Sequence, residues 1–419
     1  MQVSIRQVIK DYIGGGWGKE SPDRDHFVPA FVIRGTDLDA VQSGNASVVP
    51  FRYHKESNAR SRTLTPGDIV FEVSGGSKDQ PVGRSLLLDV ERLRRFKSAV
   101  IPASFCKKIR PDHEVVHARF LLAHFQLAWS DRRIVQWQVQ STGISNFNFE
   151  AFLDDFLIEL PPLPVQQRIA GILSAYDELI ENSHRRIKIL EAMAHALYRE
   201  WFISFRFPGH EGHPFVASSL GEIPKGWEVR TLPECVHINP RVTVPREGQK
   251  PFVPMGCLSN GLMLITDIES REGNSGAKFQ NGDTLFARIT PCLENGKTGF
   301  VQFLPDARAV AFGSTEFIVL RSHDLTPEYV YCLARSDEFR GVAIKSMSGA
   351  TGRQRVQERC FDDIQLAQPP SEVLDQFSMA VAPSFRLIYK LHLQIENLRR
   401  TRDLLLPRLL SGQINVEVA

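Results

Sequence analysis

The sequence predicts an α+β protein in which two related mixed domains alternate with two long helices. A helical segment at 160–202 recurs at 368–410 with a constant offset of 208 residues. From 154–202 against 362–410 no gap is needed, and 11 of 49 positions are identical. Each copy follows a long stretch without helical periodicity that ends in a Pro-Pro pair, so the repeating unit is a globular domain plus a long helix. A tandem duplication of this kind predicts a pseudo-two-fold molecule.

Proline- and glycine-rich junctions mark the boundaries of the predicted domains. A Pro-Pro pair precedes each helix, and the segment FPGHEGHPFVASS has the Gly, Pro and Ser residues that end a helix and start a new domain. The predicted segments are a first mixed domain at 1–160, a first helix at 161–206, a linker at 207–219, a second mixed domain at 220–368 and a second helix at 369–419.

Short apolar runs between turn signals predict strands inside both mixed domains. GDIVFEV at 67–73 and GDTLFARI at 282–289 each place Gly-Asp before a β-branched and aromatic run. Because the two runs lie at similar distances from the starts of their predicted domains, we expect the repeat to extend through the globular parts.

Apolar residues recur along both predicted helices at alternating spacings of four and three, the seam of a coiled coil. A single amphipathic helix usually docks on its own domain. About forty residues, however, form a rod about 60 Å long, which favours two helices that pair as an antiparallel spacer. The seam positions are Ile169, Leu173, Tyr176, Ile180, Ser183, Ile187, Leu190, Ala194, Leu197 and Trp201 in the first helix, and Phe377, Val381, Ser384, Ile388, Leu391, Ile395, Leu398, Arg402, Leu405 and Leu409 in the second.

Composition narrows the class of protein without deciding its function. Lys and Arg total 50 against 48 Asp and Glu, so any nucleic-acid surface must come from local patches. The longest apolar run, at 120–129, is interrupted by His124 and Gln126, and we expect neither secretion nor a membrane span. Separated cysteines favour buried free thiols in a reducing cytosol over disulfides or zinc. They are Cys106, Cys235, Cys257, Cys292, Cys332 and Cys360.

Three familiar catalytic signatures are missing from the sequence. GGGWGKE at 14–20 lacks the residues of a Walker A motif, because Ile13 and Glu20 stand where that motif needs Gly and Ser or Thr. Asn239-Pro240-Arg241 does not match the Asn-Pro-Pro-aromatic tetrapeptide of an adenine methyltransferase, and the chain contains no Glu-x-Lys. We therefore expect a binding protein with no catalytic residue, metal site or cofactor of its own.

Several motifs together resemble the specificity (S) subunits of type I restriction-modification systems, and the resemblance covers the whole chain. In the second copy, Ser371-Glu372 and Asp375-Gln376 depart from Leu163-Pro164 and Gln167-Arg168 of the first. The motifs are Thr142-Gly143 ahead of Pro161-Pro162-Leu163 and Gln167, LYREWFISF at 197–205, LGEIPKGWEV at 220–229, the closing LLPRLLSGQI, EVSGGSKDQPVGR at 72–84 and GDTLFARITPCLENGK at 282–297.

The resemblance implies a cytoplasmic, non-catalytic reader with two target-recognition domains, each binding half of a split, asymmetric sequence in duplex DNA. It also implies that the spacer helices bind two modification subunits, which use S-adenosylmethionine, and that restriction subunits supply ATP-driven cleavage with Mg²⁺. A coiled-coil scaffold that does not bind DNA, or an S subunit of a related type II-like enzyme, is the alternative.

Candidate DNA contacts are polar loop residues, because base readout needs donors and acceptors and phosphate contacts need positive charge. For any one of them a solvated turn is the alternative. The first domain contributes Ser74, Gly75, Gly76, Lys78, Gln80 and Arg84, and also Ser141, Thr142, Gly143, Ser145 and Asn146. The second contributes Arg288, Thr290, Asn295 and Lys297, and also Ser348, Thr351, Gly352, Arg353, Gln354 and Arg355.

Overall fold

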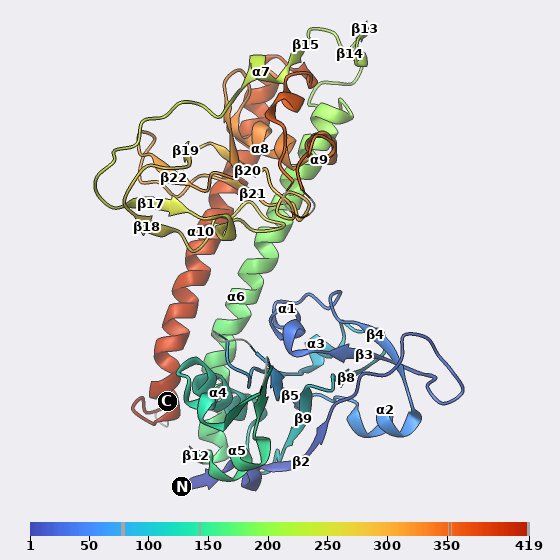
Figure 1. The fold of residues 1–419 in the computed structure, drawn as a ribbon, viewed down its shortest axis with the longest axis vertical. Helices are drawn as coiled ribbons and strands as arrows, with labels where there is room; N and C mark the ends of the chain where they lie inside the picture. The colour runs from blue at the N-terminus through green and yellow to red at the C-terminus, as the bar shows by residue number, and fades with distance from the viewer. Residues whose placement is uncertain (77–79, 142–143, 351, 353, 417–419) are drawn as a thin grey trace. The chain divides into compact units, whose positions relative to one another are not determined.

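The computed structural model describes residues 1–76, 80–141, 144–350, 352 and 354–416. Helices and sheets are mixed along this chain, which confirms the predicted α+β class (Figure 1). The chain divides into two compact units: the first unit comprises 1–182 and 395–419, and the second comprises 183–394. Each long helix therefore contributes one part to each unit.

The first unit is built on an antiparallel sheet with the strand order β2-β9-β5-β7. A second sheet has the order β4-β3-β8, in which β3 runs parallel to β8, and β1 pairs with β12. The strands are β1 (Gln2–Ser4), β2 (Ile9–Gly14), β3 (Val28–Ile33), β4 (Phe51–His54), β5 (Ile69–Glu72), β7 (Ser85–Leu87), β8 (Ala99–Pro102), β9 (Cys106–Pro111) and β12 (Leu157–Glu159). The helices are α1 (Leu38–Gln42), α2 (Glu56–Arg62), α3 (Val90–Leu93), α4 (Ala118–Ser130) and α5 (Phe149–Asp155).

The second unit repeats this pattern, with sheet orders β16-β23-β20-β21 and β18-β17-β22-β19 and a parallel pairing of β17 with β22. Strand β15 pairs with β24 as β1 pairs with β12. The strands are β15 (Glu228–Thr231), β16 (Val236–Ile238), β17 (Lys250–Val253), β18 (Glu269–Arg271), β19 (Ala277–Phe279), β20 (Thr284–Ala287), β21 (Thr298–Phe300), β22 (Ala311–Gly313), β23 (Phe317–Ser322) and β24 (Gln365–Gln368). The helices are α7 (Leu232–Cys235), α8 (Pro327–Arg335) and α9 (Asp337–Lys345).

The two Gly-Asp motifs form the same structure in both units. Gly67 and Gly282 have positive φ values of 97° and 90°, a conformation that favours glycine. The buried carboxylate of Asp68 accepts two hydrogen bonds from Arg110, at 2.8 and 2.7 Å. Asp283 accepts two from Arg321, at 2.7 and 2.6 Å. The expected strands follow these motifs as β5 and β20, so the repeat does extend through the globular parts.

Aromatic clusters pack a helix against the main sheet in each unit. In the first unit the ring of Phe71 on β5 lies 5.5 Å from Phe125 on α4 and 5.4 Å from Phe152 on α5. In the second unit Phe286 on β20 lies 5.4 Å from Phe339 on α9, and α8 packs on β20, β21 and β23 (Figure 1). These rings bury a large apolar area that stabilises each core.

The first long helix is α6 (Leu163–Tyr198), which continues as a π-helical turn at Arg199–Ile203, and the second is α10 (Ser371–Leu410). Within the first unit the two helices run antiparallel, because Arg168 donates to the carbonyl of Val416 and Asp177 pairs with Arg402. Within the second unit Phe377, near the start of α10, packs on Phe202 at 4.9 Å.

Most seam residues that the four- and three-residue spacing predicts to be buried are buried or half-buried in the structure. The buried seam residues are Ile169, Leu173, Ile180, Ser183, Ile187, Ala194, Trp201, Phe377, Val381, Ile388, Leu391, Ile395 and Leu409. The half-buried ones are Tyr176, Leu190, Leu197, Ser384, Leu398, Arg402 and Leu405. Buried apolar positions on both helices contribute to the hydrophobic core of the unit in which they lie.

Three further features differ from the sequence-based expectations or complete them. The predicted linker at 207–219 is partly ordered, since β13 (Phe215–Ser218) pairs with β14 (Gly221–Pro224). All six cysteines are free, as expected, but Cys292 and Cys360 are only half-buried. No helix in the described part of the chain is long and apolar enough to cross a membrane.

Candidate nucleic-acid interface

The two candidate segments of the first unit meet in one small sheet. Strands β10 (Gln138–Ser141), β11 (Ile144–Phe147) and β6 (Ser74–Gly75) pair in the order β10-β11-β6. Asn146 lies opposite Ser74, whose hydroxyl donates to Asn146 Oδ1 at 2.8 Å. Segments far apart in sequence thus place hydroxyl and amide groups side by side at the end of β5.

The remaining first-unit candidates differ in exposure. Gly75 and Gly76 have φ values of 125° and 70°, and a Cβ on Gly76 would lie 2.8 Å from the carbonyl of Gln80, so the turn needs glycine there. Ser145 is buried and accepts from Gln138 Nε2 at 2.9 Å, whereas Gln80 is exposed. Lys78, Thr142 and Gly143 lie outside the described residues, as does the side chain of Ser141.

Arg84 is held by a buried carboxylate. Its Nε and Nη2 donate to Glu72 at 3.0 and 2.8 Å, and the side chain is 13% exposed. These hydrogen bonds raise the pKa of Arg84. The charge of Arg84 is therefore largely matched inside the unit, and the residue positions β5 at the base of the small sheet.

The two candidate segments of the second unit also meet. Ile289 and Ser348 each form a bridge with Arg355, and the amide of Thr290 donates to the carbonyl of Gln354 at 3.1 Å. The hydroxyl of Thr290 donates to the same carbonyl at 3.2 Å. Gly352 is exposed with a φ of 82°, whereas Thr351 and Arg353 lie outside the described residues.

A shared backbone hydrogen bond shows that the two polar surfaces are equivalent. Val73 N, just after β5, donates to the carbonyl of Phe105 at 2.9 Å. Arg288 N, just after β20, donates to the carbonyl of Glu316 at 3.0 Å. Both surfaces therefore extend from the same end of the same strand of the main sheet. We call them the first and second polar surfaces, formed by 73–76 with 144–147 and by 288–290 with 348–350, 352 and 354–355.

Arginines from α8 and α9 hold the loop that follows β20. Arg335 donates to the carbonyls of Gly296 and Gly261, at 2.5 and 3.1 Å, and Arg340 donates to that of Leu293 at 3.2 Å. Lys297 donates to the carbonyl of Met255 at 3.0 Å, so its charge is partly used within the fold, while Asn295 is exposed.

Ion pairs fix two candidate arginines of the second polar surface. Arg288 Nη1 lies 2.5 Å from Glu358 Oε1. Arg355 forms a two-pronged pair with Glu316, in which Nε donates at 3.0 Å, yet its side chain remains 55% exposed. Among the described residues, Arg355 meets the carboxylate of Glu316 through Nε and Nη2, which leaves Nη1 available to a ligand.

A hollow of about 570 Å³ opens beside Arg288. It is lined by three cations, Arg241, Lys278 and Arg288, and its described lining residues include no carboxylate. Neither the side chain of Arg241 nor that of Lys278 has a hydrogen-bond or ion-pair partner among the described residues. A hollow of this charge suits phosphate oxygens. Arg241 and Lys278 are not among the sequence-predicted contacts, because they lie on separate segments without a local motif and only the fold brings them together.

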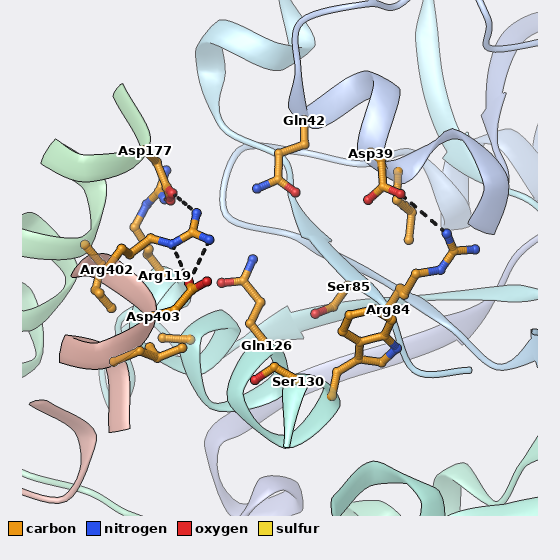
Figure 2. A pocket seen from close by; sticks show the side chains of 15 residues that line it. Asp39, Gln42, Arg84, Ser85, Arg119, Gln126, Ser130, Asp177, Arg402 and Asp403 are labelled. Carbon is orange, nitrogen blue, oxygen red and sulfur yellow. Dashed lines mark hydrogen bonds and ion pairs between the residues drawn. The ribbon is translucent and has the colours of Figure 1, made fainter. Parts of the chain in front are cut away.

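A second hollow, of about 320 Å³ in the first unit, has balanced charges (Figure 2). Asp177 on α6 accepts from Arg119 on α4 and from Arg402 on α10, both at 2.8 Å, and Arg402 also donates to Asp403. Burial lowers the pKa of Arg402, but the hydrogen bonds and charges of Asp177 and Asp403 outweigh this effect and raise it. The network ties α4, α6 and α10 together and does not present free positive charge.

His113-Glu114-Val115-Val116-His117 matches the His-Glu-x-x-His pattern of zinc sites, but these residues form a turn and loop rather than a helix. Among the described residues, the His, Cys, Asp and Glu side chains form no group of three or more that could hold a metal ion.

Comparisons with known proteins agree with this architecture. The family model of the type I restriction modification DNA specificity domain matches residues 62–192. The chain is 28% identical over 276 residues to the MjaIX specificity subunit of Methanocaldococcus jannaschii, covering 62% of this chain and 61% of that protein. It is 33% identical over 157 residues to the EcoEI specificity subunit of Escherichia coli, covering 36% of this chain and 26% of that protein. The chain thus spans less than two thirds of the length of both relatives.

A solved structure shares the fold across nearly the whole chain. The S subunit of a type I restriction-modification system from M. genitalium has a TM-score of 0.55 at 13% identity, covering 98% of this chain and 96% of that one. With the sequence matches, this confirms the resemblance read from the motifs: the chain is a relative of the specificity subunits of type I restriction-modification systems.

Proposed function

We propose that this chain is a non-catalytic specificity subunit that binds duplex DNA at a bipartite, asymmetric sequence. The observation that carries the proposal is the pair of polar surfaces, one in each unit, built on the same strand end by the same backbone hydrogen bond. Two equivalent surfaces in one chain suit two half-sites in one duplex, as in dimeric DNA-binding proteins, whose symmetry matches that of their operators.

The side chains of the two surfaces differ, which supports an asymmetric sequence. The first polar surface presents Ser74 and Asn146, which are uncharged donors and acceptors. The second presents Arg355, held by Glu316, at the corresponding place. Asn and Arg prefer different bases in the major groove, adenine and guanine respectively. One half-site read by each surface would therefore differ in sequence from the other.

Phosphate contacts are proposed for the cationic hollow of the second unit. The side chains of Arg241 and Lys278 have no partner among the described residues, and Arg288 belongs both to the hollow and to the second polar surface. Counterion release makes such contacts sensitive to salt, so removing each cation should reduce the salt dependence of binding.

The long helices are proposed to bind two modification subunits, which use S-adenosylmethionine, while restriction subunits use ATP and Mg²⁺. Large apolar side chains on these helices are exposed in the described chain, and two of them, Ile189 and Met193, are neighbours at a spacing of four residues on α6. Exposed apolar groups that lie together often mark interaction sites. The exposed side chains are those of Leu179, Ile189, Met193, Met379, Leu393 and Leu404. Assembly of this kind would place the protein in the cytoplasm, where the chromosome is.

Sequencing that detects methylated adenine tests the proposal. The full chain is expressed with its modification subunits in a host without other methyltransferases, and one split asymmetric motif should be modified. Arg241→Ala with Lys278→Ala should weaken DNA binding about uniformly across sequences and lower the salt slope by about two. Lys225→Ala, an exposed lysine outside the hollow, is the matched control.

A failure would separate the alternatives. An assembled complex that neither retains DNA nor methylates it would favour a coiled-coil scaffold. Cleavage or methylation by the purified chain alone would contradict the non-catalytic role. A modified sequence that is a perfect palindrome would contradict the assignment of one different half-site to each unit. Function within a fused type II-like enzyme would be indicated if the chain assembled only with a single combined subunit.

A further inference from the structure

Phe105 is an aromatic residue that the fold leaves in solvent. Its side chain is 60% exposed, whereas most large apolar residues of the first unit are buried. The next residue, Cys106, starts β9 and is fully buried. An exposed aromatic ring contributes little to the stability of the core. Where such a ring lies beside a candidate binding surface, we expect it to contact the ligand.

The backbone holds Phe105 directly against the first polar surface. Its carbonyl accepts from Val73 N at 2.9 Å and from Ser74 N at 3.3 Å. Cys106 N donates to the carbonyl of Ala103 at 2.8 Å, which fixes the turn before β9. Because Ser74 also binds Asn146, the backbone of Phe105 is attached to the same small sheet that carries the polar candidates. Little backbone conformational entropy would be lost when Phe105 contacts a ligand.

The equivalent position in the second unit carries a different group. Glu316 accepts the corresponding hydrogen bond from Arg288 N at 3.0 Å. Its carboxylate then holds Arg355, which remains 55% exposed. The residue that accepts this shared backbone hydrogen bond is thus Phe105, with an apolar ring, in the first unit, and Glu316, which holds the guanidinium of Arg355, in the second. This difference indicates that the residue at this position helps to determine which bases each surface recognises.

Building on the function proposed above, we propose that Phe105 is a specificity-determining residue of the first unit that contacts the C5-methyl group of one thymine in its half-site. Phenylalanine has no hydrogen-bonding group, and the thymine methyl is the one apolar feature of a base pair in the major groove. The neighbouring Ser74 and Asn146 provide the donors and acceptors for adjacent base edges. Insertion of the ring between stacked bases would be a different, sequence-tolerant use of the same side chain.

Replacing thymine by uracil tests this contact, because it removes the methyl group and leaves the hydrogen-bonding edges unchanged. The full chain, assembled with its modification subunits, is titrated with duplexes in which each thymine of the half-site, on either strand, is replaced by uracil. At one position the wild-type protein should lose affinity about fourfold, the value of one buried methyl group. The Phe105→Ala protein should bind the thymine and uracil duplexes equally.

Matched variants keep the test independent of folding. Phe105→Leu retains an apolar side chain and should keep most of the preference for thymine. Phe27→Ala removes another exposed phenylalanine of the first unit, 54% exposed, and should leave the preference unchanged. Circular dichroism and the preference at the other half-site report whether each variant is folded and assembled.

The outcomes separate this inference from the function on which it rests. A wild-type complex without any sequence preference would overturn both. A wild-type complex with a preference but no thymine position at which Phe105→Ala abolishes the effect of uracil would overturn only the role of Phe105. A uniform loss of affinity for all duplexes in Phe105→Ala would also overturn it, in favour of insertion between bases.

Discussion

The long helices meet their surroundings through charges in the first unit and through aromatic rings in the second. In the first unit Asp177 on α6 binds both Arg119 and Arg402. The position offset from Asp177 by 208 residues is Phe385, which is 1% exposed. Its ring lies 5.1 Å from Phe300 and 5.4 Å from Tyr331.

The residue that pairs with Asp177 is likewise charged in the first unit and replaced by an apolar residue in the second. Arg402 corresponds by the same offset to Ala194, which is 3% exposed. A half-buried ion pair contributes little net stability, because desolvation offsets its attraction, whereas buried rings contribute through apolar area and packing. The two duplicated helices have therefore kept the same spacing of residues, whereas one pair of corresponding positions is charged in the first unit and apolar in the second.

Phe385→Ala should have the largest effect on stability. The truncation leaves a cavity beside Phe300 and Tyr331, and we expect about 3–5 kcal/mol of destabilisation. Native-state hydrogen exchange should show the loss in peptides of the second unit, with those of 1–182 as the internal control. Phe385→Leu should cost much less, and equal effects of Ala and Leu would contradict packing as the cause.

Asp177→Ala should destabilise the first unit by about 2 kcal/mol, below the value for a fully buried pair because the side chains are partly exposed. The reason is that Arg119 and Arg402 lose their shared partner. The double variant Asp177→Phe with Arg402→Ala copies the pair found in the second unit and should recover at least half of the loss. Thermal unfolding measures both. No recovery would mean that the two layers are not interchangeable.

His124 on α4 should make the first unit sensitive to acid. Burial lowers its pKa from 6.5 to about 3, and its Nε2 has no partner among the described residues. As pH falls below 6.5 the unfolded chain takes up a proton that the folded chain rejects, so stability decreases from there toward pH 3.

The variant His124→Leu isolates that contribution. Between pH 7.5 and 5 it should lose roughly 2 kcal/mol less stability than the wild type, as measured by denaturant unfolding at each pH. His113→Leu, which changes an exposed histidine of the same unit, should follow the wild-type curve. Parallel curves for wild type and His124→Leu would show that this imidazole is protonated in the folded protein.

Glu316→Gln should leave the fold stable and act on recognition alone. The amide keeps the size of the side chain but weakens its hold on Arg355, so discrimination at one base pair of the second half-site should fall about tenfold. Methylation rates on duplexes with single substitutions measure this, and Glu338→Gln, an exposed site on α9, is the control. A change in the first half-site instead would contradict the division between the units.

The sequence by itself determined the features that depend on local pattern. Seam spacing predicted α6 and α10, and the Gly-Asp runs predicted β5 and β20, because turn residues and apolar periodicity act over a few residues. The same local motifs carried the resemblance to specificity subunits, which the comparisons confirmed.

Only the tertiary structure decided which of those residues meet. Sheet order placed Ser74 beside Asn146, gave Arg84 the buried partner Glu72, and brought Arg241 and Lys278 into one hollow. No local signal distinguishes the guanidinium of Arg84, which is bound by Glu72, from that of Arg241, which has no partner among the described residues. Contacts between distant segments depend on strand pairing and burial, which single-residue chemistry does not encode.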